Sequence, residues 1–270
     1  MKLDAGDLAM IRSWLVEAGQ IALDGFAQAQ VHYKADHTPA TDVELRIEQQ
    51  LIKRIQTHFP GQQILTEEQG LEETGSPYCW VLDPIDGTKP YLRGLPVWGI
   101  SLGLLVGQTP AAGFFYTPVT RDMYWGTPDG AFWNERPLNG SAALALDDPL
   151  AFLAVTSEAH RKYEIRYPRL QAYGSAAAHL AYVARGIAVG ALTRRAYLWD
   201  IAGMLPVLQA SGVELAYLSG HPVALERLLR GAQAGDAFLA ARPENMARLR
   251  GMIKTKRAEG MISDHHQGGK

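Results

Sequence analysis

The chain has 270 residues, with 26 Lys and Arg against 28 Asp and Glu, so its formal net charge of −2 does not favour binding to a nucleic-acid polymer. Hydrophobic residues make up 47% of the sequence and charged residues 20%, which is typical of a packed globular protein and excludes a disordered one. The single cysteine, Cys79, excludes an intramolecular disulfide framework, and no apolar run approaches the roughly 20 residues that cross a bilayer. The amino-terminal segment lacks a signal-peptide core, so we expect a cytoplasmic protein that does not associate with membranes.

The first half of the chain predicts an α+β unit. Apolar residues recur every three or four positions over 3–25 and 44–58, which indicates two amphipathic helices, and the polar stretch 32–42 between them is expected to be irregular. Short apolar runs at 63–66 and 78–82 then predict strands, and an antiparallel meander follows. The meander strands are expected at 97–106, 111–116 and 122–126, and 130–138 closes this half.

Beyond residue 140, strand patterns alternate with helical ones, which predicts an α/β half with a smaller mixed sheet. No flexible linker is evident, so we expect residues 1–140 and 141–256 to pack directly together, and residues 257–270 to form a mobile tail. Pro206 argues for a kink or a later start in the helix predicted over 200–211. Strands are expected at 151–155, 170–174, 188–192, 213–218 and 236–241, and helices at 176–185 and 243–254.

Carboxylates follow apolar runs at three places in the sequence. Glu67 and Glu68 come directly after a predicted strand, and another strand runs into Asp83-Pro-Ile-Asp-Gly-Thr88. The third place is Trp199-Asp-Ile-Ala-Gly203, where an aspartate lies between apolar residues. Carboxylates beside buried strands are costly unless a positive charge meets them, and Mg²⁺ binds such oxygen ligands. The pattern therefore predicts a site for divalent metal ions.

The second place has the spacing that such a site requires. Asp83 and Asp86 lie three residues apart across a turn that contains proline, so their carboxylates and the Ile85 carbonyl can converge. Gly87 leaves room for a phosphate near the backbone, and Thr88 adds a hydroxyl group. A helix that begins here would offer free N–H groups to an anion.

Structural roles compete with this interpretation when each place is considered alone. Asp-Pro-x-Asp-Gly is a common turn sequence, and Glu67-Glu68 fits a solvated loop. Asp200 fits the N-cap of the helix that follows it. Only the combination of the three places favours a metal site.

In this combination the sequence resembles the inositol monophosphatase family, whose members carry Glu-Glu after a strand, then Asp-Pro-Ile-Asp-Gly-Thr, then Trp-Asp-x-Ala-Gly far downstream. Gly130-Ala-Phe-Trp-Asn134 and Gly174-Ser-Ala-Ala177 match as well, and the resemblance spans residues 8 to 255. It implies a layered αβαβα sandwich with an antiparallel sheet in the first half and a smaller mixed sheet in the second. It also implies a Mg²⁺-dependent phosphoric monoester hydrolase that Li⁺ inhibits and that pairs as a homodimer, as many members do.

The resemblance implies that two or three Mg²⁺ ions bind at the site. Glu67, Asp83 and the Ile85 carbonyl would hold the first ion. Asp83, Asp86 and Asp200 would hold the second, with Asp83 as the bridging ligand, and Glu67 would help to hold a third ion through waters. These two ligand sets form the metal centre that we expect.

The resemblance also assigns catalytic roles. Asp83, Glu67 and Thr88 are the expected catalytic residues: Glu67 and Thr88 would orient the attacking water, and the backbone N–H groups of Gly87 and Thr88 would bind the phosphate. Family members usually carry an aspartate where this chain has Glu44. Either Glu44, which is one methylene longer, or Asp42 would take over its role near the third ion.

The part of the site that selects the substrate is less well determined by the sequence. Substrate contacts are expected from Glu44, Ser175, Ala176 and Thr193. Thr193 stands where members specific for inositol phosphates carry a glutamate, which weakens the case for that substrate. The following residues, Arg194-Arg195, either meet a second anionic group or are surface charges.

The leading hypothesis is therefore a phosphomonoesterase that acts on a small soluble phosphate ester. A lysine directly after Asp-Gly-Thr, here Lys89, resembles the sequence of the 3'(2'),5'-bisphosphate nucleotidases, and the segment 94–99 resembles that of the histidinol-phosphate phosphatases. Both activities therefore remain alternatives. A contrasting hypothesis from another class is a non-enzymatic module that binds a metal or a phosphate metabolite on the same scaffold.

Overall fold

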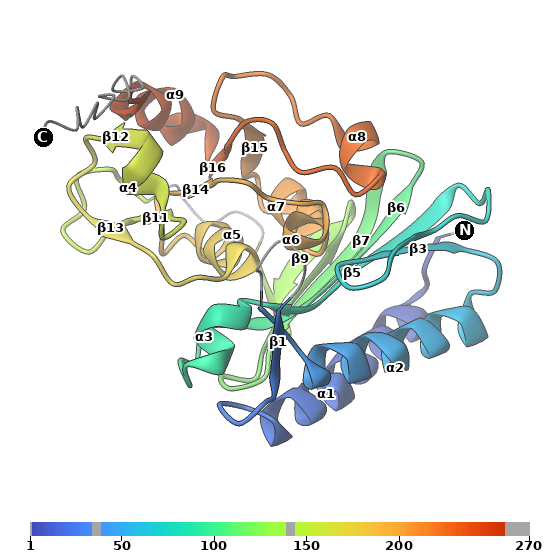
Figure 1. The fold of residues 1–270 in the computed structure, drawn as a ribbon. Coiled ribbons are helices and arrows are strands. Elements are labelled where there is room, and N and C mark those ends of the chain that lie inside the picture. The colour runs from blue at the N-terminus through green and yellow to red at the C-terminus, as the bar shows by residue number, and fades with distance from the viewer. Residues whose placement is uncertain (1, 34–38, 139–143, 257–270) are drawn as a thin grey trace, which may run out of the picture.

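The computed structural model describes residues 2–33, 39–138 and 144–256, which form five layers of helices and sheets (Figure 1). Helices α1 (Ala5–Asp24) and α2 (Asp42–His58) cover one face of a large sheet. Helices α5 (Ala176–Ala184), α6 (Trp199–Ala202) and α7 (Leu205–Ala210) fill the space between this sheet and a second one. Helix α9 (Pro243–Met252) packs on the outer face of the second sheet. The predicted αβαβα sandwich is confirmed. The shorter helices are α3 (Thr88–Leu92), α4 (Ala159–Lys162) and α8 (Leu225–Leu229).

The large sheet has eight strands, and every neighbouring pair is antiparallel except β3 with β5. The predicted antiparallel meander is therefore confirmed, and the parallel pair places two strand ends at the same edge of the sheet. In spatial order the strands are β10 (Arg136–Pro137), β9 (Gly130–Trp133), β8 (Asp122–Thr127), β7 (Thr109–Thr117), β6 (Gly99–Val106), β5 (Tyr78–Asp86), β3 (Gln63–Thr66) and β4 (Gly70–Glu72).

The second sheet has five strands and is mixed, as the sequence predicts. Strand β11 pairs in parallel with both β13 and β14, whereas β16 is antiparallel to β14 and β15. In spatial order the strands are β13 (Leu170–Gln171), β11 (Leu153–Val155), β14 (Gly190–Thr193), β16 (Phe238–Ala241) and β15 (Glu214–Tyr217).

Two short strand pairs differ from the prediction. In the stretch 32–42, which we expected to be irregular, β1 (Val31–Tyr33) pairs with β2 (Pro39–Thr41). The helix predicted over 243–254 ends at Met252, because Ile253–Thr255 forms β17 and pairs with β12 (Tyr163–Ile165). Strands of three residues are too short to show a period in the sequence, so they form only where the rest of the fold supplies a partner.

Two helix boundaries also differ. Helix α2 begins at Asp42 and not at Glu44, because Thr41 and Glu44 form a capping box in which each side chain accepts the other residue's backbone N–H. The helix predicted over 200–211 is two helices, α6 and α7, and Pro206 lies in the first turn of the second, where proline is tolerated. The predicted mobile tail, 257–270, lies outside the described residues, and the division of the chain near residue 140 stays a prediction.

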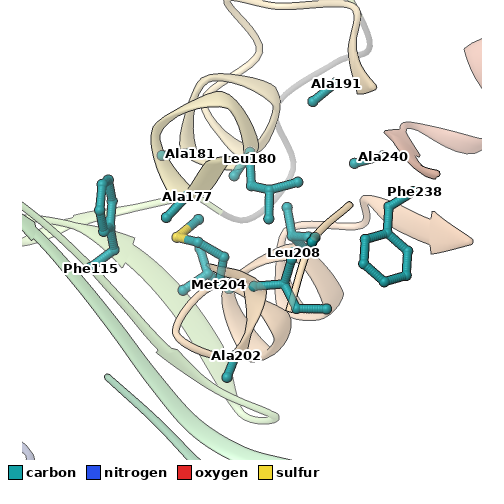
Figure 2. Close-up of a cluster of buried hydrophobic side chains, with 14 of the residues drawn as sticks. Phe115, Ala177, Leu180, Ala181, Ala191, Ala202, Met204, Leu208, Phe238 and Ala240 are labelled. Carbon is teal, nitrogen blue, oxygen red and sulfur yellow. The ribbon is translucent and has the colours of Figure 1, made fainter. Parts of the chain in front are cut away.

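Small side chains let the central helices approach both sheets closely (Figure 2). The cluster contains Ala177 and Ala181 of α5, Phe115 of the large sheet and Phe238 of the second sheet, all buried. Residues from both halves of the chain thus share one core. Among the described residues, no helix is long and apolar enough to span a bilayer.

Backbone contact fixes the segment that carries Asp200. A Cβ atom added to Gly203 would overlap the Phe114 carbonyl oxygen and would lie 2.5 Å from Ser101 Oγ. Only glycine permits this approach, so the loop between α6 and α7 lies directly on strands β6 and β7.

Candidate active site

The parallel pair β3–β5 brings the first two acidic places together. Thr66 of β3 is in register with Leu82 of β5, so Glu67 and Asp83 are the next residues on neighbouring strands. The Glu67 N–H donates to the Leu82 carbonyl at 3.3 Å, which continues the ladder by one more bond. Glu67 is half-buried and Asp83 is 1% exposed. The two carboxylates therefore leave the sheet side by side at the same edge.

Strand β5 bends where its acidic residues begin. The pairing of β5 with β6 shifts register between Asp83 and Asp86, and Asp83 Oδ1 accepts the Ile85 N–H at 3.0 Å. The Ile85 carbonyl oxygen lies 3.4 Å from the Thr88 hydroxyl oxygen. The turn predicted between Asp83 and Asp86 is instead a bulge within β5, and it carries buried carboxylates.

The N-terminus of α5 holds Asp86. Asp86 Oδ2 accepts from the Ser175 hydroxyl at 2.5 Å and from the Ala177 N–H at 2.7 Å, and Asp86 Oδ1 accepts from the Ala176 N–H at 3.0 Å. Helix N-termini favour a negative charge, so α5 fixes this carboxylate. We expected Ser175 and Ala176 to contact substrate. The Ser175 hydroxyl and the Ala176 N–H instead donate to Asp86, and contact of these residues with substrate stays a prediction.

Asp200 comes to the same place from α6. Its Oδ2 accepts the Tyr197 N–H at 2.6 Å, and Leu198, not Asp200, precedes the first residue of the helix. The N-cap alternative for Asp200 is therefore wrong. Asp83, Asp86 and Asp200 each offer a carboxylate oxygen, and the three oxygens lie within 4.8 Å of one another.

These three carboxylates lack a basic partner. No ion pair with a Lys, Arg or His side chain involves them in the part of the chain that the structure describes. Burial raises the pKa of Asp83 well above the usual value, and repulsion from the carboxylates of Glu67, Asp86, Asp200 and Glu44 raises it further. Burial raises the pKa of Asp86 to about 6, although the Ser175 hydroxyl opposes this, and burial together with Asp86 raises the pKa of Asp200. A divalent cation with oxygen ligands would relieve this repulsion, so the residues fit a metal.

Glu44 contacts Thr88 at the edge of this cluster. The Thr88 hydroxyl donates to Glu44 Oε1 at 2.7 Å, while Glu44 Oε2 accepts the Thr41 N–H of the capping box at 2.5 Å. Glu44 is fully buried, and burial raises its pKa to about 7. Asp42 instead accepts the Gln30 N–H at 3.2 Å. Of the two candidates from the sequence, Glu44 is the one that reaches the site.

The sequence analysis missed a second carboxylate on α2. Glu48 is fully buried, and its Oε2 accepts the Glu68 N–H at 3.2 Å, next to Glu67. It lies one helical turn after Glu44, on the face that carries Ile47 and Leu51. A charged residue on an apolar helix face was the available signal.

Gly87 has a conformational role. Its φ is 104°, a left-handed value that favours glycine, and it precedes the first residue of α3. A Cβ atom there would lie 3.2 Å from side-chain carbons of Pro90, Trp98 and Ser175. The structure thus requires glycine for the turn and for packing, and the binding of phosphate by the Gly87 and Thr88 N–H groups stays a prediction.

One cavity of about 330 Å³ brings most of the predicted residues together. Its lining includes acidic residues from each of the three places in the sequence and the substrate candidates Ser175, Ala176 and Thr193, whereas Glu44 and Glu68 are not part of it. His179 and Thr156, which the sequence did not single out, line it too. The lining residues from the metal-binding and phosphate-binding predictions are Glu67, Asp83, Ile85, Asp86, Gly87, Thr88 and Asp200.

Comparison with known proteins agrees with this geometry. The model of the inositol monophosphatase family matches residues 7–250. The chain belongs to this family.

Relatives in the family carry several activities in their names. The chain is 33% identical over 198 residues to the inositol-1-monophosphatase ImpA of Mycolicibacterium smegmatis, which covers 68% of this chain and 71% of the relative. It is 28% identical over 236 residues to a fructose-1,6-bisphosphatase/inositol-1-monophosphatase of Aquifex aeolicus, covering 82% and 89% of the two chains. The extragenic suppressor protein suhB from Bartonella henselae has the same fold, with a TM-score of 0.80 at 19% identity over 92% of this chain and 98% of that one.

Proposed function

We propose that this family member is a Mg²⁺-dependent phosphomonoesterase that hydrolyses a small soluble phosphate ester, with water as the nucleophile. The observation that carries the proposal is the convergence of Asp83, Asp86 and Asp200 in a cavity that Glu67 also lines. Buried carboxylates that repel one another destabilise the folded protein, and bound cations would offset this repulsion.

Two ligand sets account for the carboxylates. Glu67, Asp83 and the Ile85 carbonyl would hold one ion, and Asp83, Asp86 and Asp200 would hold a second, while Glu67 would also support a third. When bound, such a pair of divalent ions activates water and stabilises the charge on the attacking and leaving oxygens of the displacement. The hydrogen bonds that Asp86 accepts from α5 would keep this ligand in place during turnover.

Thr88 and Glu67 would orient the water. Because the Thr88 hydroxyl donates its hydrogen to Glu44 Oε1, its oxygen lone pairs are left to accept a hydrogen bond from the water. Glu67, at the same edge of the sheet as Asp83, would accept the other hydrogen. The backbone N–H groups of Gly87 and Thr88 would bind the phosphate oxygens.

Three further properties belong to this proposal. The enzyme would act in the cytoplasm, would be inhibited by Li⁺, and would pair as a homodimer. Li⁺ carries a single charge and is small, so it would occupy a cation position without supplying the charge of Mg²⁺. Unchanged activity at high Li⁺ concentration would contradict inhibition by Li⁺. A monomeric mass in solution would contradict the homodimer.

A phosphate-release assay tests the function. The purified protein is incubated with inositol phosphate, histidinol phosphate, a sugar phosphate and a 3',5'-bisphosphate nucleotide, with Mg²⁺ or with EDTA. We expect Mg²⁺-dependent release from at least one ester and its loss in Asp83→Asn. Binding of Mg²⁺ without release from any ester would instead support the non-enzymatic module.

A further inference from the structure

The ends of two strands of the second sheet form part of the cavity lining. Strands β11 and β14 are parallel, with Val155 in register with Leu192, and the Thr156 N–H continues the ladder to the Leu192 carbonyl at 3.1 Å. Thr156 and Thr193 are therefore neighbours at the carboxyl ends of two parallel strands, and both line the cavity. Ligands commonly bind at this edge of a sheet in α/β proteins.

Three buried polar atoms in this wall have no partner. Thr156 Oγ1, His179 Nδ1 and Thr193 Oγ1 make no hydrogen bond in the described part of the chain. His179 Nε2 accepts the Tyr173 N–H at 3.1 Å, so Nδ1 carries the proton of the neutral ring and is a donor. Folded proteins satisfy nearly all of their buried polar groups, so three unsatisfied atoms on residues that line one cavity point to a ligand that supplies the missing partners.

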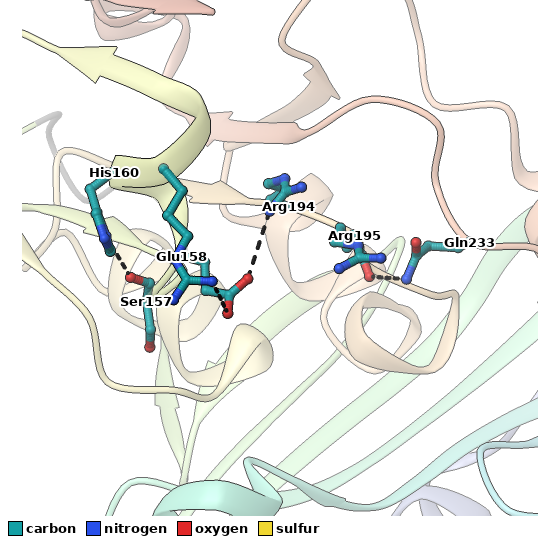
Figure 3. A network of polar contacts seen from close by, with 7 residues as sticks. Ser157, Glu158, His160, Arg194, Arg195 and Gln233 are labelled. Carbon is teal, nitrogen blue, oxygen red and sulfur yellow. Dashed lines mark hydrogen bonds and ion pairs between the residues drawn. The ribbon is translucent and has the colours of Figure 1, made fainter. Parts of the chain in front are cut away.

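Three basic residues line the same cavity. Arg194 and Arg195 directly follow β14, and Lys89 belongs to α3. Figure 3 shows the two arginines on one segment, with Arg194 directed toward Glu158. The Arg195 backbone has a φ of 58°, and its carbonyl accepts from Gln233 Nε2 at 3.0 Å, which fixes this turn. Within the described residues, neither Lys89 nor Arg195 has an acidic partner.

Glu158 is the acidic residue of this part of the lining, and it does not neutralise the wall. It lies 3.8 Å from Arg194 Nη1, beyond hydrogen-bond distance, and it also contacts Arg161 at 3.5 Å. On the segments that follow β11 and β14, one carboxylate therefore stands against two arginines that line the cavity, so positive charge and hydrogen-bond donors predominate in this part of the lining. A ligand with several acceptor atoms and a negative charge matches this wall.

We propose that the donor wall, formed by Thr156, His179, Thr193, Arg194 and Arg195, binds a second anionic group of the substrate. The substrate class is then a small phosphate monoester that also carries a carboxylate or a second phosphate. This inference rests on the proposed phosphatase function, because the hydrolysed phosphate would lie at the carboxylates of the proposed metal site.

Matched substrates test the inference with the whole protein. Glycerol 2-phosphate and 2-phosphoglycerate differ by one carboxylate, and fructose 6-phosphate and fructose 1,6-bisphosphate differ by one phosphate. In one pair, we expect kcat/KM to be at least about tenfold higher for the ester that carries the additional anionic group. The pair that shows this preference identifies the second group as a carboxylate or a phosphate. Arg194→Gln and Arg195→Gln should each reduce this ratio by about fivefold or more, mainly through KM.

Two further variants sharpen the test. Glu158→Gln should increase the ratio, because it removes a repulsive charge and releases Arg194. Arg166→Gln removes one positive charge, as the Arg194 and Arg195 variants do, from an exposed site directly after β12 that does not line the cavity, so it should leave the ratio unchanged. Equal kcat/KM within both pairs, a preference for the less anionic members, or a fall of the ratio in Glu158→Gln would each overturn the inference. If neither these four esters nor those of the phosphate-release assay released phosphate with Mg²⁺, the proposed function itself would fail, and the inference with it.

Discussion

Glu44 Oε1 accepts the hydrogen of the Thr88 hydroxyl at 2.7 Å, while the other oxygen of the same carboxylate caps helix α2 at the Thr41 N–H. One side chain thus links the start of α2 to the start of α3, and it does so from the position where the family usually has a shorter aspartate. The extra methylene lets the carboxylate serve both groups. The orientation of Thr88 is therefore coupled to the stability of a helix end.

Replacing Thr88 should impair turnover more than binding. Thr88→Val keeps the shape of the side chain and removes the hydroxyl, so we expect kcat to fall about 100-fold with little change in KM. Thr57→Val, on the exposed face of α2, is the control and should retain full activity. A large rise in KM at unchanged kcat would show that Thr88 binds substrate and does not orient the water.

Removing one buried carboxylate should stabilise the metal-free protein. Asp83→Asn eliminates a charge that Glu67, Asp86 and Asp200 repel, so its melting temperature in EDTA should exceed that of the wild type. Mg²⁺ at about 100 times its Kd should stabilise the wild type by about 2.7 kcal/mol and the variant by much less. Thermal melts with and without Mg²⁺ measure both effects, and equal Mg²⁺ stabilisation of the two proteins would contradict the ligand assignment.

Buried His179 should make the protein less stable in acid. Burial lowers its pKa from 6.5 to about 4, so the unfolded chain takes up a proton that the folded chain does not accept until lower pH. This contribution to stability is complete above pH 6.5 and is lost as the pH falls toward 4. Between pH 7 and pH 4.5, His179→Gln should lose about 2 to 3 kcal/mol less unfolding free energy than the wild type, as measured in urea. Parallel pH curves for the two proteins would contradict the prediction.

Gly203 should tolerate no side chain. Gly203→Ala forces a Cβ atom into the Phe114 carbonyl oxygen, so we expect a loss of about 3 kcal/mol in unfolding free energy together with weaker Mg²⁺ binding at Asp200. Gly251→Ala is the matched control, because no atom lies within 4 Å of its added Cβ and it lies within helix α9. That variant should be stabilised by up to about 1 kcal/mol.

Glu48 should support the metal site indirectly. Its carboxylate holds the Glu68 N–H, so Glu48→Ala would release the loop that carries Glu67 and weaken Mg²⁺ affinity by about tenfold. Gln49→Ala, next in the chain and exposed, should leave the affinity unchanged. Calorimetric titration with Mg²⁺ compares the two variants, and equal affinities would assign Glu48 a purely structural role.

The acidic places could be predicted because their chemistry is local. A carboxylate at the end of an apolar strand is unusual in itself, and the spacing from Asp83 to Asp86 is visible in six residues of sequence. The helices and the antiparallel meander followed from periods of 3.6 and 2 in the same way, whereas their arrangement in layers was implied by the resemblance to the family. The fold class therefore contained few surprises.

The missed features depend on partners that are distant in the sequence. Ser175 donates a hydrogen bond to Asp86, which lies 89 positions earlier in the sequence. The donor wall places Thr156 beside Thr193 only because β11 pairs with β14. Pro206 indicated a kink or a later start of the helix over 200–211, but the sequence did not show that the break falls where Gly203 lies on the large sheet. Such arrangements are set by packing, and no local pattern encodes them.

The hydrogen bonds between Asp86 and the start of α5 carry a consequence for biogenesis. Asp86 leaves the ribosome 89 residues before Ser175, and Asp200 follows later still. A nascent chain that ends before residue 175 holds part of the acidic set with neither its anchor nor its last carboxylate in place. On the proposed ligand assignment, a chain would capture Mg²⁺ only late in its synthesis, after Asp200 has joined Asp83 and Asp86.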